Sequence, residues 1–341
     1  MTEILKVKDL RISFFTHVGE VKAIRGVDFS VKEGEIVGIV GESGSGKSVT
    51  SLSVMGLLQR PGKVIGGEIL FKGEDLLKKS KRDMVSLRGN EISMIFQDPM
   101  TSMNPVYTVG RQIEEAISNH MKLSKEELKA KTVEMLDMVK IPSPEQRVKN
   151  YPHEFSGGMR QRAMIAMALA CGPDLLIADE PTTALDVTIQ AQIVKLMKDI
   201  NEELNTSIIF ITHDLGVVAD ICQRVIVMYG GLIMEEGTVD EIFYNPRHPY
   251  TMGLLHSIPE VSSGEKTRLI PIKGTPPDLL NPPQGCPFFD RCEYAMEICR
   301  KTQPLYFEEG EGHRTMCWLM HPDAPVNSKY EKQKGGVESG K

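Results

Sequence analysis

The chain has 341 residues, 41% of them hydrophobic and 25% charged, and its formal net charge at pH 7 is −6. This length suits one large domain with an appendage or two domains, and the apolar fraction is sufficient for a substantial core. The negative charge disfavours nonspecific binding of nucleic acid, so we expect no nucleic-acid partner. The sequence has no apolar run of about 18 residues and no signal-peptide core, which predicts a cytosolic protein without a membrane-spanning helix.

The first 140 residues show two kinds of periodicity. Short alternating or apolar runs predict strands, the alternating ones antiparallel, at 5–7, 27–31, 35–40, 67–71 and 92–96. A helix is expected over 48–58, and the basic run at 78–82 is predicted to be a solvated loop. From 108 to 140 the spacing becomes helical, and Ser124 with Glu127 forms a capping box at the start of one helix.

The second half alternates helices with continuous apolar strands, which is typical of an α/β core with parallel strands buried on both faces. The expected elements are helices at 157–170 and 188–204 and strands at 175–178 and 207–212. Residues 224–235 read as a hairpin that turns at Gly230-Gly231. After about residue 245 prolines become frequent, which indicates a change of domain.

The segment 41–48, Gly-Glu-Ser-Gly-Ser-Gly-Lys-Ser, lies between an expected strand and an expected helix and has the pattern of a phosphate-binding loop. Glycines let backbone N–H groups converge on phosphate oxygens, and the helix directs its positive end at the same anion. Lys47 is expected to reach the β and γ phosphates, and the Ser48 hydroxyl to ligate Mg²⁺. The alternative is a flexible glycine turn. The residues expected to contact ATP here are Gly41, Ser43, Gly44, Ser45, Gly46, Lys47, Ser48 and Val49.

Polar residues at the ends of three apolar strands are candidates for roles in the hydrolysis of the bound nucleotide. Asp179 and Glu180 follow the strand at 175–178; Asp179 is expected to hold Mg²⁺, and Glu180 to orient or deprotonate the attacking water. Gln97 ends another strand, where its amide is placed to touch the metal and the water. His213 ends a third, where a ring nitrogen is placed to donate to the γ-phosphate. Each is otherwise an ordinary polar residue at a strand end.

A second helix N-terminus is also suited to an anion. Ser156 precedes two glycines, including Gly158, at the start of the expected helix at 157–170. Within a single chain this site has no obvious phosphate, because Lys47 already serves that end of the nucleotide.

Taken in order, these motifs resemble those of the nucleotide-binding subunits of ABC transporters. The matching segments are Walker A (41–48), the Q-loop Gln97, the signature (156–161), Walker B (175–180), the D-loop (184–186) and the switch His213. The resemblance implies two cassettes joined head to tail, with each ATP between Walker A of one and the signature of the other. Ser156 and Gly158 would then act on the partner's nucleotide, and Asp186 would cross the interface.

The resemblance also implies which residue contacts adenine, and the sequence departs from the family's pattern in one motif. Phe14 matches the aromatic residue that stacks on adenine, with Phe15 as the alternative. The common signature reads Leu-Ser-Gly-Gly-Gln, whereas Phe155 and Met159 replace its first and last members here. The serine and both glycines are kept, so the anion site is expected to function, and Glu180 and His213 indicate a catalytic subunit rather than a regulatory one.

Longer segments are similar to the branch of this family that imports oligopeptides and dipeptides. They are residues 96–105, 153–162, 181–188 and 245–251. The resemblance implies a heterodimer with a second, homologous ATPase, two membrane permeases, an extracytoplasmic peptide-binding protein, and a peripheral place on the cytoplasmic face of the membrane. The helical segment at about 100–150 would transmit motion to the permeases, or else only pack. Nickel and other small solutes remain alternative cargoes. A soluble ABC ATPase of the repair type is disfavoured because no sustained heptads separate Walker A from the signature.

Four cysteines gather near the C-terminus: Cys286, Cys292, Cys299 and Cys317. The spacing alone leaves a metal site and simple buried thiols both open, since structural zinc favours closer pairs. The resemblance implies a [4Fe–4S] cluster on these four residues, with zinc as the alternative. Cys171 and Cys222 are expected to be buried packing residues.

We therefore predict an α/β fold, namely an ABC-type P-loop NTPase core with an antiparallel β subdomain and a helical subdomain, plus a small Cys-rich C-terminal module. The nucleotide-binding domain is placed at 1–261, with its helical subdomain at about 100–165. The Pro-rich, four-cysteine domain is placed at 262–321, and the polar tail at 322–341 is predicted to be disordered.

Overall fold

The computed structural model describes residues 2–97, 102–183, 185–257, 271–310, 312–325 and Tyr330. The chain forms two compact units, each considered by itself below. The first contains Met1–Leu5, Val31–Ile36 and Leu70–Ile211, and the second contains Lys6–Ser30, Val37–Ile69 and Thr212–Lys341. The predicted domain boundary at 261/262, Ala184 of the D-loop, residues 98–101 and most of the predicted tail lie outside the described residues.

The first unit has a core of three parallel strands, in the order β8-β7-β6. They are β6 (Ile92–Ile95), β7 (Leu175–Asp179) and β8 (Ser207–Thr212), and every residue in them is buried. Continuous apolar sequence suits this arrangement, because both faces of each strand are covered. Helix α8 (Val187–Leu204) lies between β7 and β8 in the chain and buries one apolar face, as its helical spacing predicts.

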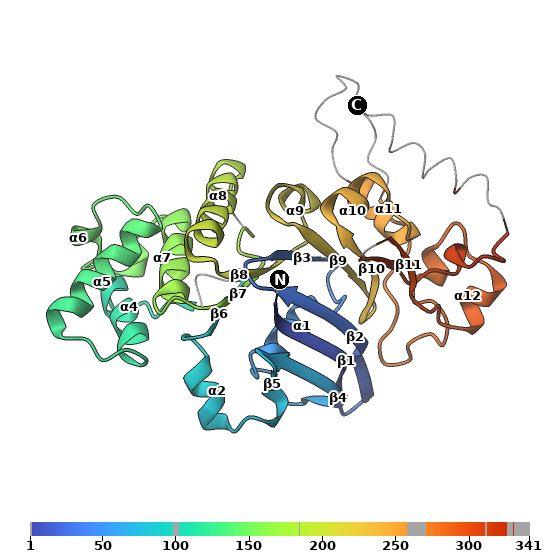
Figure 1. The fold of residues 1–341 in the computed structure, drawn as a ribbon, viewed down its shortest axis with the longest axis horizontal. Helices are drawn as coiled ribbons and strands as arrows, with labels where there is room; N and C mark the ends of the chain where they lie inside the picture. Colours follow the sequence, from blue (N-terminus) through green and yellow to red (C-terminus); the bar gives the residue numbers. More distant parts are fainter. Residues whose placement is uncertain are drawn as a thin grey trace, which may run out of the picture. The chain divides into compact units, whose positions relative to one another are not determined.

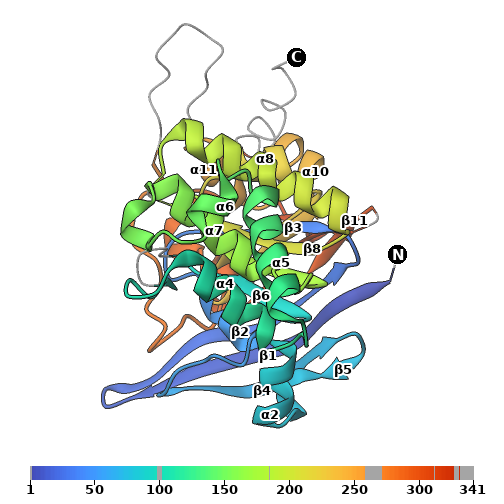
Figure 2. The same ribbon diagram turned by 90° about the vertical axis from the view of Figure 1, so that its left-hand side faces the viewer.

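Among the described residues of the first unit, a group of four helices gathers together in both ribbon views (Figures 1 and 2). They are α4 (Val109–Ser118), α5 (Lys125–Met138), α6 (Pro144–Arg147) and α7 (Gly157–Leu169). The predicted capping box at α5 is confirmed: Ser124 N donates to Glu127 Oε2 at 2.8 Å, and Glu127 N donates to Ser124 Oγ at 3.3 Å. These hydrogen bonds lower the pKa of Glu127.

One local expectation in this unit is wrong. The basic run at 78–82 is not a loop, because Ser80 caps a short helix, α2 (Lys81–Leu87), with Asp83 completing a capping box. Its first part belongs to a 3₁₀ turn, η1 (Leu76–Lys78), where Lys78 pairs with Asp75 at 2.9 Å. The run is solvated, as predicted, but its serine starts a helix.

The second unit contains a five-stranded sheet portion in the order β11-β12-β10-β9-β3. Its strands are β3 (Ile36–Val40), β9 (Arg224–Tyr229), β10 (Leu232–Thr238), β11 (Phe307–Glu309) and β12 (His313–Thr315). The pair β3/β9 is parallel and the others are antiparallel. The hairpin between β9 and β10 turns at Gly230 and Gly231, both at positive φ, as predicted.

The strands near the N-terminus are longer than the alternating runs suggest. They are β1 (Glu3–Thr16), β2 (Gly19–Lys32) and β4 (Gly62–Phe71), with the short β5 (Glu74–Asp75), and the sheet order is β2-β1-β4-β5. Strands β1 and β2 form a hairpin, and β4 and β5 pair antiparallel. Helix α1 (Lys47–Val54) ends earlier than predicted, with Gly56 at φ 60° just beyond it.

The remaining helices belong to the second unit, apart from η2 (Pro152–Glu154) in the first. They are α9 (Leu215–Ile221), α10 (Val239–Tyr244), α11 (Pro249–Leu255), α12 (Glu297–Lys301), η3 (Phe289–Arg291) and η4 (Trp318–Met320). A buried carboxylate organises this region: Glu235, 0% exposed, accepts hydrogen bonds from the backbone N–H groups of Arg247 and His248 and contacts His313 Nε2 at 2.8 Å. Burial lowers the pKa of His248 to about 3.

One described residue of the predicted tail is packed rather than disordered. Tyr330 is 3% exposed, forms a cluster with Met252 and Tyr294, and donates to Arg247 O at 2.8 Å.

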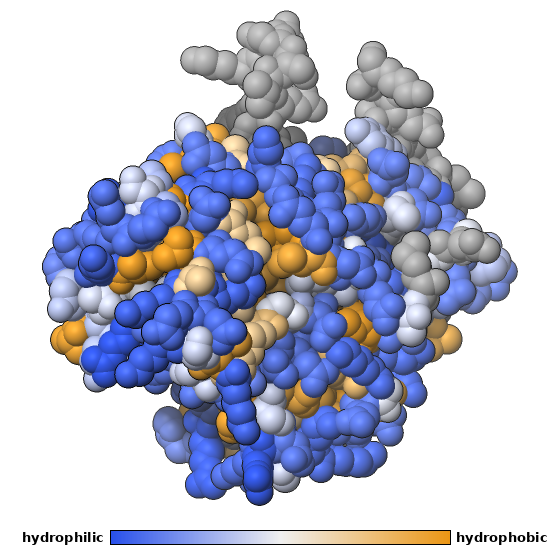
Figure 3. Space-filling view, turned by 60° about the vertical axis from the view of Figure 1, so that its left-hand side comes forward, coloured by the Kyte–Doolittle hydropathy of each residue, from blue (hydrophilic) through white to orange (hydrophobic). Residues whose placement is uncertain are grey.

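The surface is mostly hydrophilic on the face shown in Figure 3, with apolar residues in small groups between polar ones. None of the helices among the described residues combines the length and apolarity that a membrane crossing needs.

Candidate active site

In the second unit, β3, the loop at 41–46 and α1 form the predicted strand–loop–helix arrangement. Gly41, Gly44 and Gly46 have φ values of 150°, 77° and 108°. A Cβ at Gly41 would lie 2.1 Å from the backbone oxygen of Met228, so the loop passes too close to β9 for a larger residue. Positive φ and close approach together explain why glycine is needed here. Glycine-rich loops with such φ values are suited to binding phosphate through backbone N–H groups.

Lys47 lies within this loop. Its Nζ donates to Gly41 O at 2.7 Å and to Glu42 O at 3.0 Å, and it lies 3.4 Å from Ser45 Oγ. The residue is only 6% exposed. An ammonium group buried beside the N-terminus of α1 adds positive charge to the same cavity of N–H groups, so the loop and Lys47 fit a triphosphate, and Ser48 follows on the same helix.

In the first unit, two side chains donate hydrogen bonds to one carboxylate, that of Glu180. Gln97 Nε2 donates to Glu180 Oε2 at 2.8 Å, and Thr183 Oγ1 donates to the same oxygen at 2.9 Å. Glu180 follows the buried Asp179 at the end of β7 and has φ 48°. A glutamate in the left-handed region is strained, and such strain concentrates at functional positions. Thr183 is a contact that the sequence analysis missed.

The signature residues lie at the start of α7. Ser156 is exposed and its Oγ accepts a hydrogen bond from Met159 N at 3.3 Å, which makes it the N-cap. A Cβ at Gly158 would lie 2.8 Å from Ile189 Cγ2, whereas one at Gly157 would meet nothing within 4 Å. Asp186 caps α8 through Ile189 N at 3.0 Å. The predicted anion site and the D-loop aspartate are therefore neighbours through Ile189 in this unit.

The remaining residues predicted to contact the nucleotide are in the second unit. Phe14 is half-buried, and its Cε1 would be 2.8 Å from a Cβ at Gly62. Phe15 is 46% exposed, with Lys63 Nζ 5.5 Å from the centre of its ring. His213 is exposed and directly follows β8. The choice between Phe14 and Phe15, and the role of His213, stay predictions.

The four C-terminal cysteines are close together and desolvated. Cys286, Cys299 and Cys317 are buried, Cys292 is half-buried, and none forms a disulfide. Burial raises the pKa of Cys286 and of Cys292 to about 12 and also raises the pKa of Cys299 and of Cys317. The four residues lie near enough to one another for the negative charge of one thiolate to raise the pKa of another.

This thiol group does not yet have the geometry of a metal site. Over the described ranges, no three Cys, His, Asp or Glu side chains are arranged to hold a metal ion. Binding would therefore require the thiols to turn toward a common point. The other two cysteines are packing residues to different degrees: Cys222 is buried, as expected, whereas Cys171 is only partly buried.

Comparison with known proteins gives matches over nearly the whole chain. Residues 24–183 match the family "ABC transporter", and residues 234–299 match "Oligopeptide/dipeptide transporter, C-terminal region". The chain is 60% identical to the oligopeptide transport ATP-binding protein OppD of Bacillus subtilis (strain 168), over 95% of this chain and 91% of that protein. It is 53% identical to the dipeptide transport ATP-binding protein DppD of Lactococcus lactis subsp. cremoris (strain MG1363), over 95% and 93%.

A solved structure is also similar. It is a dimeric ATP-binding cassette in a post-hydrolysis state bound to ADP and phosphate, with a TM-score of 0.62 and 29% sequence identity. The match covers 69% of this chain and 98% of that one.

Proposed function

The chain belongs to the family of ATP-binding subunits of oligopeptide and dipeptide ABC transporters, and we propose that it hydrolyses ATP to drive peptides into the cell through two membrane permeases. The observation that carries this proposal is the hydrogen-bonded set of Gln97, Thr183 and Glu180 directly after the buried Asp179. It combines a metal-holding acid with an oriented base, which ATP hydrolysis requires.

Each predicted site residue has an assigned role in this proposal. The glycine loop and Lys47 bind the β and γ phosphates, and Phe14 stacks on the adenine. Ser48, Asp179 and Gln97 would hold the Mg²⁺ that accompanies ATP, which neutralises charge on the phosphates when bound. Glu180 takes the proton of the attacking water, and two donors fix the orientation of its carboxylate. His213 donates a hydrogen bond to the γ-phosphate.

A second subunit completes each site. We place Ser156, Gly158 and Asp186 against the nucleotide held by the partner, because Ser156 and Asp186 are exposed and already cap two neighbouring helices. The dimeric form of the similar cassette with ADP and phosphate supports this arrangement. In the full transporter the partner is a homologous ATPase, and the assembly lies on the cytoplasmic face of the membrane with an extracytoplasmic binding protein opposite.

Peptide transport can be tested by reconstituting this chain with its permeases and partner ATPase in liposomes. We expect a peptide-loaded binding protein to stimulate ATP hydrolysis and labelled di- or oligopeptide to accumulate inside. Uptake of Ni²⁺ instead of peptide would show that the cargo is nickel, and the proposed ATPase activity would stand. A rate of ATP hydrolysis that is the same with and without the permeases and the binding protein would favour a soluble ABC ATPase.

We further propose that Cys286, Cys292, Cys299 and Cys317 bind a [4Fe–4S] cluster, for which four thiolates are suitable ligands. The support is the mutual proximity of four free, desolvated thiols in a Pro-rich segment with little core of its own. The bound cluster would cross-link this segment. Protein purified without oxygen should contain iron and sulfide and absorb near ~400 nm, and Cys317→Ser should lose both. Zinc without iron would identify the alternative metal, and absence of both would contradict the proposal.

A further inference from the structure

We propose that Arg291, in the C-terminal region, is a positioning residue that orders the Walker A loop for ATP through Glu42. The inference rests on the proposed ATPase function and adds a specific role for residues outside the nucleotide-binding motifs. Arg291 precedes Cys292 in the chain, whereas Glu42 is the second residue of the phosphate-binding loop. Both belong to the second unit.

The contact between them is a paired hydrogen bond. Arg291 Nη1 donates to Glu42 Oε2 at 2.5 Å, and Nη2 donates to Glu42 Oε1 at 2.9 Å. The Arg291 side chain is 4% exposed and that of Glu42 is 28% exposed. The carboxylate raises the pKa of Arg291. A bidentate pair in such surroundings fixes the direction of the Glu42 carboxylate, because both of its oxygens are engaged.

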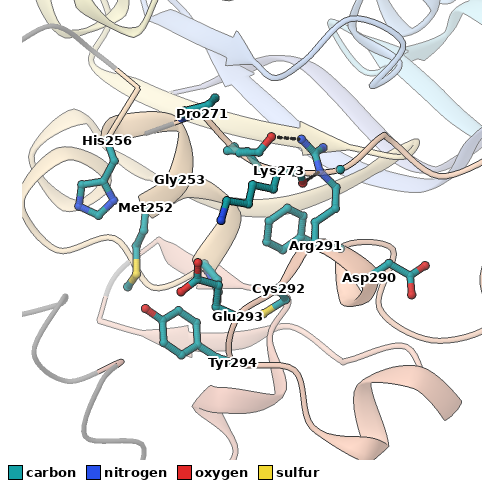
Figure 4. A pocket seen from close by; sticks show the side chains of 14 residues that line it. Met252, Gly253, His256, Pro271, Lys273, Asp290, Arg291, Cys292, Glu293 and Tyr294 are labelled. Carbon is teal, nitrogen blue, oxygen red and sulfur yellow. Dashed lines mark hydrogen bonds between the residues drawn. The ribbon is translucent and has the colours of Figure 1, made fainter. Parts of the chain in front are cut away.

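Arg291 is itself held rigidly. Its Nε donates to Lys273 O at 2.9 Å, Nη2 to Ile272 O at 3.2 Å, and Nη1 to Tyr229 Oη at 3.1 Å. Figure 4 shows the guanidinium directed at the backbone beside Lys273, in the wall of a cavity of about 470 Å³. A guanidinium fixed by this many acceptors presents the remaining N–H groups to Glu42 with little freedom to move.

Glu42 has two more anchors. Its backbone N–H donates to Tyr250 Oη at 2.8 Å, and its carbonyl accepts from Lys47 Nζ at 3.0 Å. Tyr250 is 0% exposed and packs against Tyr229 and Phe288, with ring centres 4.6 and 5.3 Å away. The aromatic group thus supports both the tyrosine that binds Glu42 and the arginine that pairs with it.

The segment that carries Arg291 is hydrogen-bonded to β2. Lys22 N donates to Leu279 O and Arg25 Nη2 donates to Pro283 O, each at 2.9 Å. Pro276 and Pro277 line a small cleft together with residues 42–45. Residues 272–291 thus contact both β2 and the Walker A loop, and Arg291 is their charged contact with that loop.

This arrangement predicts an effect on ATP affinity rather than on the chemical step. A loop ordered before ATP arrives loses less conformational entropy on binding, so removal of its brace weakens binding. Once ATP is bound, the phosphates themselves order the loop, and turnover at saturating ATP should change little.

The experiment compares Arg291→Met, Glu42→Gln and the double variant in the assembled ATPase. We expect each single variant to raise the Kd and the KM for ATP by about tenfold, the effect of one lost charge-assisted hydrogen bond, with kcat within about twofold. The double variant should be no weaker than either single variant, because all three lose the same interaction. Arg291→Lys, which keeps the charge but not the paired geometry, should fall between wild type and Arg291→Met.

The matched control is Arg314→Met, which breaks another arginine pair of the C-terminal region, with Glu236 at 2.7 Å, away from the Walker A loop. It should leave the Kd for ATP unchanged. The inference would be overturned if Arg314→Met weakened ATP binding equally, or if both Arg291→Met and Glu42→Gln bound ATP with wild-type affinity. In either case, ATP hydrolysis by the wild-type assembly would still support the proposed ATPase function. Glu42→Gln decides the matter if Arg291→Met does not fold. A wild-type assembly that neither binds nor hydrolyses ATP would refute the proposed function itself.

Discussion

Replacing Glu180 with glutamine is expected to lower ATP turnover by about 10² to 10⁴-fold, the usual contribution of a general base. The amide keeps the shape of the side chain but cannot accept the proton of the attacking water. Because Gln97 and Thr183 both donate to Glu180 Oε2, a glutamine that keeps its oxygen there also keeps both hydrogen bonds. ATP binding should therefore persist, and the variant should hold ATP in a stable dimer.

Turnover and nucleotide retention are measured together, by phosphate release and by size-exclusion chromatography with labelled ATP. Glu203→Gln, an equal change at an exposed position on α8, serves as the control and should hydrolyse ATP at the wild-type rate. Unchanged turnover in Glu180→Gln would remove this residue from the role of base.

Replacing Gly158 with aspartate is expected to cost about 10² to 10³-fold in turnover, comparable with the loss of a group that stabilises transition-state charge. Two physical effects combine. A Cβ at this position would lie 2.8 Å from Ile189 Cγ2, so α7 and the start of α8 must shift. The added carboxylate would also place negative charge at a helix N-terminus proposed to face the partner's γ-phosphate.

A second substitution in the same motif distinguishes a loss of catalysis from a loss of folding. Met159→Gln restores the last residue of the common signature and should stay active, since residue 159 contributes only its backbone N–H to the Ser156 cap. Melting temperatures identify any variant that fails to fold. An active Gly158→Asp assembly with normal stability would contradict a role for this helix end in hydrolysis.

Sequence reasoning predicted the parts of this protein that depend on local pattern. The strands at 175–178 and 207–212 follow from continuous apolar runs, and the cap at Ser124 follows from its spacing to Glu127. The phosphate loop is predictable because its glycines, Lys47 and flanking elements are contiguous.

What sequence reasoning missed depends on contacts between residues far apart in the chain. β11 and β12 are three residues each, too short to show a period, yet β12 pairs with β10 through Glu235↔Thr315. The buried Glu235 has no local signal, since its partners are backbone groups that only the fold brings close. The pairing of Arg291 with Glu42 and the convergence of Thr183 on Glu180 belong to the same class.

Mixing two inactive variants is the most direct test of the central claim, that this chain supplies only half of each ATP site. Lys47→Ala disables Walker A and leaves the signature intact, whereas Gly158→Asp does the opposite. The test uses dimers of two copies of this chain, without the homologous ATPase, and in such dimers each variant paired with itself should be inactive. Mixed dimers should recover ATP hydrolysis, because one of their two sites then combines an intact Walker A with an intact signature. If verified mixed dimers stay inactive, or if a strictly monomeric preparation hydrolyses ATP at the full rate, the shared-site account is wrong.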